Sequence, residues 1–352
     1  MFVELHNPES LTNEELDAHL ANGWFRMGQA IFTTNFLKFN DIIYSSIWLR
    51  IDLNSFETTK FQQKILKNIA KFEVQIQSAK ITQEQENLFY KYKNHITFEA
   101  APSLQNLLFG QKQSNIYETF EINIYDEEKL IAVGIFDLGD RSAMGITCFY
   151  DPDYKKYSLG KYLMYLKMDF CKEKGMNFFY PGYFAPGYPL FDYKLDLAKP
   201  SLQYLDVVTD SWFPFESFSP NKIPFDIMCQ KLKLLGEKLD KRSIKNQFQY
   251  YDFFDADMSA NLNGLGLFDY PVFLACPELT DILFKPVIIF DVREGQYHLA
   301  LCSRVYESIF EDSLPDHYNV YILQIAKYIY TGDSANEMVE VVEMCHLQMM
   351  NV

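Results

Sequence analysis

The sequence predicts an α+β fold in which a mixed, mainly antiparallel β-sheet is flanked by helices. Three strand-like runs follow one another between residues 118 and 150, and only short polar turns separate them, which is typical of an antiparallel meander. A helix-like run then leads into a further strand-like run at residues 177–184. The chain has 352 residues, of which 48% are hydrophobic, and this is enough to bury a substantial core.

Residues 1–115 are predicted to form an N-terminal mixed α/β region. The patterns Thr12-x-x-Glu15 and Thr82-x-x-Gln85 match the capping box that begins a helix. Alternating hydrophobic residues over 43–53 indicate a half-buried strand, and hydrophobic residues over 61–72 recur at helical spacing. We therefore expect a helix, a strand and two further helices in this region.

Residues 116–215 are predicted to contain the central sheet. Its strands are expected at Glu118–Tyr125, Leu130–Leu138, Ser142–Tyr150 and Asn177–Phe184. A helix is expected between the last two strands, with Ser158 as its N-cap and an end near Lys174. The order of three strands, a helix and a strand is that of the acyl-CoA N-acyltransferase (GNAT) fold. Topology alone assigns no function to that fold.

Residues 216–352 are predicted to form an acidic C-terminal α/β extension after a proline-rich linker. From Asn246 onward, 16 acidic residues accompany only 4 basic residues. We expect a basic helix at 225–245, strands at 286–292 and 296–302, and two helices at the C-terminal end.

Basic residues are concentrated in three windows of a protein whose formal charge is −15. Residues 60–80, 155–175 and 231–245 each contain four more basic than acidic residues. The acidic total disfavours non-specific binding of nucleic acid to the whole surface, but a local basic stripe is still able to bind a polyanion. A solvated helix face is the alternative interpretation of each window.

Membrane, secreted and zinc-ribbon proteins are disfavoured. No apolar run approaches the roughly 20 residues that span a bilayer, and the N-terminus lacks the pattern of a signal peptide. The six cysteines are far apart and form no Cys-x-x-Cys pair, and the six histidines lack metal-ligand spacing. We expect a cytoplasmic protein without a metal or cofactor.

The turn at the start of the predicted 158–174 helix has a modified phosphate-binding pattern. Acetyl-CoA-dependent members of the GNAT fold have Gln/Arg-x-x-Gly-x-Gly/Ala here, and backbone N–H groups at the helix start bind the pyrophosphate. The corresponding stretch, Tyr157-Ser-Leu-Gly-Lys-Tyr162, keeps one glycine but has a tyrosine at the second small position. A phosphate still fits the helix start, whereas the pattern disfavours acetyl-CoA.

Three segments in this core carry a resemblance to a known family. They are Leu130-Ile-Ala-Val-Gly-Ile-Phe-Asp137, then Phe149-Tyr-Asp-Pro-Asp-Tyr154 with Tyr157–Tyr162, and then Tyr180-Pro-Gly-Tyr-Phe184 with Tyr193-Lys194. In order and spacing they resemble the aminoacyl-tRNA–protein transferases of the arginyl/leucyl N-end-rule type, and the similarity covers about residues 23–205. The resemblance implies transfer of Arg or Leu from aminoacyl-tRNA to a protein N-terminus, usually one starting with Asp or Glu, in N-degron degradation.

The sequence departs from that family in two places. The family's N-terminal cysteine cluster, which is linked to metal or iron–sulfur binding, has no counterpart in residues 31–37. The family's Cys-Pro-Lys-Met segment appears as Tyr188-Pro-Leu-Phe191. We therefore predict no metal cluster, and the resemblance does not choose between Arg and Leu.

The resemblance implies a site that positions two substrates. An aminoacyl ester is already activated, and an α-amine with a pKa of about 8 needs little help to lose its proton. The catalytic residues implied are Asp137, Tyr150, Asp151, Tyr183 and Tyr193. The tRNA- or phosphate-binding residues implied are Lys155, Lys156, Ser158, Leu159, Gly160, Lys161 and Lys194.

In this scheme the carboxylates pair with a substrate ammonium group, and the tyrosines stack on adenine or return a proton to the leaving hydroxyl. Backbone N–H groups near Cys148–Tyr150 stabilise the oxyanion, and the helix start binds the 3′-terminal phosphate. Each residue also has a structural interpretation, because carboxylates cap turns, tyrosines fill cores and lysines cover surfaces.

Two other functions stay open at this stage. One is an acyl-CoA-dependent N-acetyltransferase on the same fold. The other is a non-catalytic family member that acts as a binding protein through its acidic extension. The predicted partners are aminoacyl-tRNA and a protein or peptide N-terminus, and neither DNA nor a membrane is expected.

Overall fold

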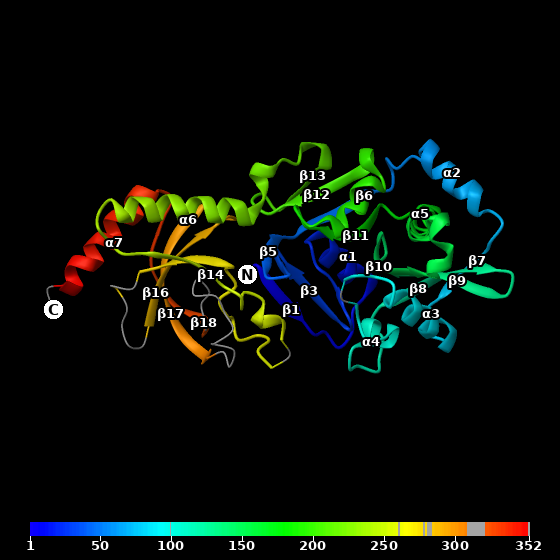
Figure 1. Ribbon diagram of the computed structural model, residues 1–352, viewed down its shortest axis with the longest axis horizontal. Helices are drawn as coiled ribbons and strands as arrows, with labels where there is room; N and C mark the ends of the chain where they lie inside the picture. The colour runs from blue at the N-terminus through cyan, green and yellow to red at the C-terminus, as the bar shows by residue number, and fades with distance from the viewer. Residues whose placement is uncertain (99, 260, 277–278, 280–283, 308–320, 351–352) are drawn as a thin grey trace.

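The structure is a computed structural model that describes all residues except 99, 260, 277–278, 280–283, 308–320 and 351–352. The molecule is elongated, and its two largest sheets lie next to each other along the longest axis (Figure 1). The larger sheet has eight strands and the smaller has five.

The eight-stranded sheet contains all four strands predicted for the central core. In spatial order its strands are β13 (Ser211–Pro214), β12 (Leu202–Asp206), β6 (Ile47–Asp52), β11 (Phe178–Phe184), β10 (Ser142–Tyr150), β9 (Lys129–Leu138), β8 (Glu118–Asp126) and β7 (Glu73–Ser78). Only β10 and β11 are parallel neighbours. The predicted α+β, GNAT-like and mainly antiparallel sheet is confirmed, including the meander β8–β9–β10.

Helices cover both faces of this sheet (Figure 1). On one face, α5 (Leu159–Glu173) and α2 (Lys60–Ile69) share a hydrophobic core with the central strands. On the other face lie α1 (Asn13–Ala21), α3 (Gln83–Lys93) and α4 (Leu104–Phe109). The face with α1 also carries a small sheet of β1 (Val3–His6), β3 (Ala30–Thr34) and β2 (Phe25–Met27).

Most of the predicted local signals agree with the structure. Both predicted capping boxes are formed at the starts of α1 and α3. The strand expected at 43–53 is divided at Ser46 into β5 (Ile42–Ser45), which pairs with β4 (Phe36–Phe39), and β6. The prediction that Ser158 caps α5 is wrong, because its side chain accepts no N-cap hydrogen bond.

The C-terminal extension forms a five-stranded antiparallel sheet with two helices on one face (Figure 1). Its elements are α6 (Pro224–Asp240), β14 (Gln247–Tyr250), β15 (Val272–Ala275), β16 (Phe284–Asp291), β17 (Gln296–Glu307), β18 (Tyr321–Gly332) and α7 (Ala335–Met350). The prediction of two helices at this end is wrong, since the described residues after β17 form a strand and one helix. Isoleucine and tyrosine dominate β18, and both favour strands.

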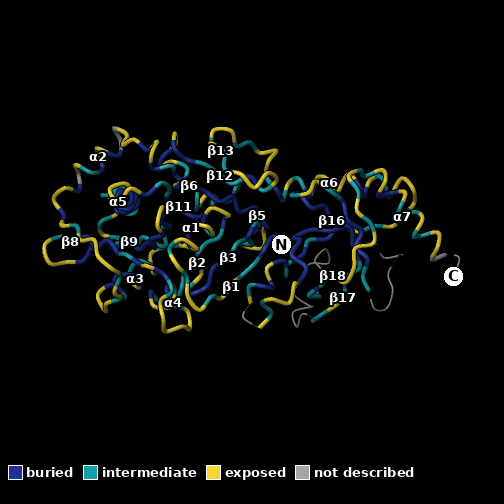
Figure 2. The backbone as a smooth tube through the Cα atoms, turned by 180° about the vertical axis from the view of Figure 1, so that it is seen from behind, coloured by how far each residue is buried: buried dark blue, intermediate teal, exposed yellow. Residues whose placement is uncertain are grey.

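The N-terminal segment packs into the core of this C-terminal sheet. Phe2 and Val3 are fully buried in a hydrophobic cluster with residues of α6, β15, β16 and β17. The ring of Phe2 lies 5.2 Å from that of Tyr270. Figure 2 shows the buried residues gathered along the sheets, with exposed residues on the outer turns of the helices.

The division at residues 115 and 215 stays a prediction. The structure joins strands across the first boundary, since β6 and β7 precede residue 116 and belong to the eight-stranded sheet. None of the helices in the described residues has the length and apolar character needed to cross a bilayer.

Candidate active site

Several of the predicted site residues lie near the point where β10 and β11 separate. The two strands are paired only from Ser142 to Met144 and from Phe178 to Tyr180. Beyond these pairs, the start of α5 lies beside the end of β10, and the 3₁₀ segment η2 (Pro189–Asp196) packs against β11. Residues from three separate parts of the sequence therefore meet at one end of the sheet.

Lys194 lies in η2, beside β11, and is nearly buried. Its residue surface is 7% exposed, and its Nζ donates a hydrogen bond of 2.6 Å to the carbonyl oxygen of Tyr183. Nζ also lies 4.8 Å from the ring centre of Phe191. Burial lowers the pKa of the Lys194 ammonium to about 7. The side chain thus exchanges readily between its neutral and charged forms near neutral pH, which distinguishes it from a surface phosphate-binding lysine.

The rings of Tyr183 and Phe191 lie near Lys194 Nζ, at 5.3 Å and 4.8 Å, and further aromatic residues belong to the candidate site. Tyr183 packs edge-on against Trp48 at a centroid distance of 5.1 Å, and burial raises the pKa of Tyr183 to about 12. Tyr150 lies 5.4 Å from Tyr92. Tyr193 exposes 44% of its surface, although burial around its phenol group raises the pKa. Tyr183 and Tyr193 are therefore protonated at neutral pH.

The start of α5 has no side-chain cap. Ser158 has a left-handed backbone with φ +56° and makes no side-chain cap, so the first N–H groups of α5 lack the usual side-chain acceptor. The Cα of Gly160 faces Tyr150, and a Cβ at this position would lie 3.6 Å from that ring. Leu159 anchors the turn in the core and is fully buried. Lys155 and Lys156 are exposed in the preceding 3₁₀ segment η1 (Pro152–Tyr157).

Asp137 is enclosed by protein groups and is not available to a substrate. Its carboxylate is fully buried and accepts hydrogen bonds from Arg26 Nη1 at 2.9 Å and from the Thr119 hydroxyl at 2.6 Å. Arg26 comes from β2, on the small N-terminal sheet, so the ion pair ties that sheet to β9. This placement corrects the expectation that Asp137 pairs with a substrate ammonium group.

Asp151 also has protein partners rather than an open carboxylate. It forms ion pairs with Lys91 at 2.6 Å and Lys129 at 2.7 Å, and it accepts a hydrogen bond from the backbone N–H of Asp153 as the N-cap of η1. Burial acts to raise its pKa, but the hydrogen bonds from Lys129 and Lys91 prevail and lower it to about 2. The structure therefore gives Asp151 the role of fixing the turn before α5.

A buried lysine that the sequence interpretation missed lies beneath this region. Lys167, on α5, is fully buried, and its Nζ donates to the carbonyl oxygens of Ile135 at 2.8 Å and Thr147 at 2.9 Å. It also lies 3.3 Å from Cys148 Sγ, beside the irregularity in the β9–β10 pairing between Gly145 and Thr147. The signal in the sequence was a lysine within the apolar stripe of an amphipathic helix.

Gly134 makes room for this lysine, and a larger side chain there is expected to destabilise the fold. A Cβ at Gly134 would lie 2.9 Å from Lys167 Cε and 3.1 Å from Leu163 Cδ2. We expect Gly134→Ala to lower the free energy of unfolding by about 1–3 kcal/mol, measured by urea denaturation. The matched control is Gly160→Ala, whose Cβ would make only ordinary contacts. Equal stability of the two variants would contradict this packing argument.

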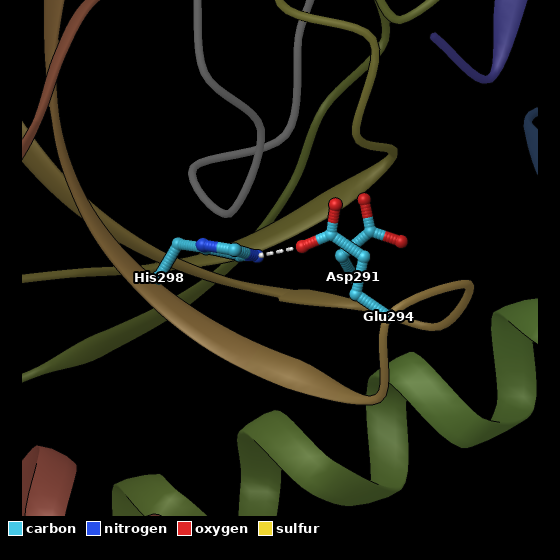
Figure 3. A group of neighbouring side chains, drawn as sticks. All are labelled: Asp291, Glu294 and His298. Carbon is cyan, nitrogen blue, oxygen red and sulfur yellow. Dashed lines mark ion pairs between the residues drawn. The ribbon is translucent and has the colours of Figure 1, made fainter. Parts of the chain in front are cut away.

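A group of possible metal ligands lies outside this region, on the hairpin of β16 and β17 (Figure 3). Ligand atoms of Asp291, Glu294 and His298 all lie within 4.8 Å of one another, and His298 Nε2 is 3.4 Å from Glu294 Oε2. Both carboxylate oxygens of Asp291 already accept hydrogen bonds, from Arg293 and from the Tyr270 hydroxyl. The arginine charge opposes a second cation, so an ion-pair network explains the group better.

A hollow of about 760 Å³ lies between the N-terminal region, β12 and the start of α6. Its lining includes Trp24, Trp48, Asp206 and Lys222. None of the predicted site residues lines it, but Trp48 packs against Tyr183. The hollow thus borders the candidate site at Trp48, but none of the polar groups of the site lines it.

Comparison with known proteins identifies the family. The model for the C terminus of arginine-tRNA-protein transferase matches residues 84–204. Aspartate/glutamate leucyltransferase from Leptospira interrogans is 30% identical over 193 residues, which are 53% of this chain and 73% of that protein. The protein of the same name from Campylobacter jejuni is 25% identical over 199 residues, covering 55% of this chain and 82% of that protein.

Among solved structures, a GCN5-related N-acetyltransferase from Kribbella flavida aligns with a TM-score of 0.25 and 14% identity, covering 42% of this chain and 61% of that chain. The family assignment therefore rests on the similarity in sequence to the family model and to the leucyltransferases. This chain belongs to the aminoacyl-tRNA–protein transferase family and is an aminoacyltransferase.

Proposed function

We propose that the protein transfers leucine from leucyl-tRNA to the N-terminal α-amine of proteins that begin with Asp or Glu, and thereby marks them for N-degron degradation. The names of the similar proteins, aspartate/glutamate leucyltransferases, support this donor and these acceptors. Arginine is the alternative donor, in keeping with the name of the matching family model. The observation that carries the proposal is the grouping of Lys194, three tyrosines and the start of α5 where β10 and β11 separate.

Binding of the charged tRNA end follows from the electrostatics of this region. The first N–H groups of α5, at Leu159 and Gly160, are oriented to bind the 3′-terminal phosphate. Lys155, Lys156 and Lys161 add positive charge around the same turn. The exposed face of Tyr193 is suited to stacking on the terminal adenine. Backbone N–H groups near Cys148–Tyr150 are the proposed oxyanion donors.

Lys194 is the proposed proton acceptor for the attacking amine. In its neutral form, Nζ takes the proton that the α-amine loses as its nitrogen bonds to the ester carbonyl carbon. The bond between that carbon and the ribose oxygen then breaks, and the proton ends on this oxygen. Tyr193 or Tyr183, which stay protonated at neutral pH, can relay it. Reactants and products balance without a cofactor or a covalent enzyme intermediate.

The proposal is tested with purified protein, tRNA charged with labelled leucine or labelled arginine, and peptides that begin with Asp, Glu, Lys or Arg. We expect label from leucyl-tRNA in the Asp and Glu peptides, and none in an N-acetylated Asp peptide, which lacks the amine. Label from arginyl-tRNA alone would reassign the donor. Acetylation by acetyl-CoA without transfer from either tRNA would support the N-acetyltransferase alternative, and no transfer at all would support the binding-protein alternative.

A further inference from the structure

Two basic windows that are far apart in the sequence form one surface in the structure. Helix α2 packs against both α5 and η1, so the segments that carry the first two basic windows are neighbours in the structure (Figure 1). The exposed lysines of this surface, here called the lysine surface, are Lys64, Lys67, Lys71, Lys155 and Lys156.

The lysine surface lacks the ion pairs that neutralise lysines elsewhere in the molecule. Lys91 and Lys129 pair with Asp151, and Lys222 pairs with Asp206. Within the described residues, no member of the lysine surface forms an ion pair with a carboxylate, and Lys71 instead donates to the hydroxyl of Tyr157 at 3.2 Å. A patch of uncompensated positive charge on a protein of net charge −15 is a selective site for a polyanion.

Helix α2 is held firmly and is connected to the candidate active site. Ile65 and Ile69 are buried in the core shared with α5, and a capping box between Thr59 and Gln62 fixes the start of the helix. The side chain of Gln62 is buried and donates a hydrogen bond of 2.8 Å to the carbonyl oxygen of Leu197, three residues after Lys194. The lysine face therefore has a fixed position relative to the site.

We propose that the lysine surface binds the sugar–phosphate backbone of the tRNA acceptor stem whose aminoacylated end occupies the site. This inference rests on the proposed function, because it assigns a second contact to the same donor. A ten-residue helix is about 15 Å long, so α2 extends the positive charge well beyond the single phosphate at the start of α5. Contacts of this kind fix the register of the RNA without reading its sequence.

The test compares two donors that differ only in having a stem. One donor is leucyl-tRNA, and the other is 3′-leucyl-adenosine, which has the reactive ester but no acceptor stem. The variant is Lys64→Glu with Lys67→Glu. The matched control is Lys233→Glu with Lys241→Glu, two exposed lysines at α6 on the C-terminal sheet. The melting temperature of each variant shows whether the fold is retained.

We expect the α2 variant to lower kcat/KM for leucyl-tRNA at least about tenfold and to reduce the slope of log kcat/KM against log salt by about two. Transfer from 3′-leucyl-adenosine and both activities of the control variant stay unchanged. An equal loss with both donors, or no loss with either, overturns the inference. If the unmodified protein transfers leucine from neither donor, the proposed function fails instead.

In that case the lysine surface is tested by binding alone, with an acceptor-stem RNA hairpin as the probe. Weaker binding by the α2 variant than by the control still supports an RNA-binding surface. Equal binding, or displacement of the hairpin by polyglutamate at equal charge concentration, overturns it and points to an acidic protein partner.

Discussion

Replacing Lys194 with methionine is expected to lower the rate of aminoacyl transfer by about a hundredfold or more, since positioned general bases contribute factors of this size. Methionine resembles the unbranched aliphatic part of the buried lysine side chain, but it lacks the amine and cannot accept a proton. The rate is measured with labelled leucyl-tRNA and a peptide that begins with Asp. For the unmodified protein, kcat/KM should rise with pH through about 7, where Lys194 becomes neutral. It should continue to rise through about 8, where the acceptor α-amine loses its proton.

The stability of the same variant distinguishes a functional lysine from a structural one. Burial lowers the pKa of Lys194 from 10.5 to about 7, so between these values the unfolded chain binds more protons than the folded protein. The free energy of unfolding therefore rises with pH across this window. Below the window, Lys194 is charged in the folded protein and lowers the free energy of unfolding by the full cost of burying that charge. Lys194→Met removes the penalty, and we expect an unchanged or higher melting temperature at pH 7 together with the loss of activity.

Two further variants show which property of Lys194 matters. Lys194→Arg keeps a positive charge, but arginine stays protonated and cannot act as a base. It therefore restores activity only if the role of Lys194 is to bind phosphate. We expect no restoration. Lys199→Met is the control. Lys199 lies five residues after Lys194, is exposed and forms an ion pair with Asp196. A Lys194→Met variant with normal kcat/KM would remove Lys194 from the mechanism.

Replacing Gly160 with glutamate is expected to weaken charged-tRNA binding by at least about tenfold. The new carboxylate would stand at the start of α5 and repel the 3′-terminal phosphate from the helix N–H groups. The fold should tolerate it, because an acidic side chain in the first turn of a helix is favourable and the space beside Gly160 is open to ordinary contacts. Filter binding of labelled leucyl-tRNA measures the affinity.

Gly160→Ala separates the effect of charge from that of size. A methyl group at this position would meet only the ring of Tyr150, at 3.6 Å, and we expect nearly unchanged affinity. If Gly160→Glu binds the tRNA as well as the unmodified protein does, the terminal phosphate does not lie at this turn. If Gly160→Ala binds as poorly as Gly160→Glu, close backbone approach decides affinity rather than charge.

The sequence predicted the parts of the fold that depend on neighbouring residues. Capping boxes at Thr12 and Thr82 and the meander from Glu118 to Tyr150 are set by local hydrogen bonds and alternation. The position of β6 beside β11 and β12 was not predictable in the same way, since pairing between distant strands leaves no short-range pattern. The error at β18 has a similar origin, because its hydrophobic residues suit either a strand or a buried helix.

The candidate site shows the same limit. Motif order assigned Tyr183, Tyr193, Lys194 and Gly160 to one site, which stays a prediction, and it gave no information about burial. The partners of Asp137 and Asp151 come from Arg26, Lys91 and Lys129, which only the folded chain brings to them. The sequence could assign carboxylates to strand ends, but could not show that protein cations already neutralise them.

The burial of Phe2 and Val3 in the C-terminal core has a consequence for how the protein is made. These residues are synthesised before most members of their hydrophobic cluster, which include Phe273, Ile288 and Val342. The segment must therefore remain unpacked until these residues have been synthesised, and contacts of such large sequence separation are slow to form. Deleting residues 216–352 would leave Phe2, Val3 and Phe36 exposed, so aggregation of the truncated chain is the expected outcome.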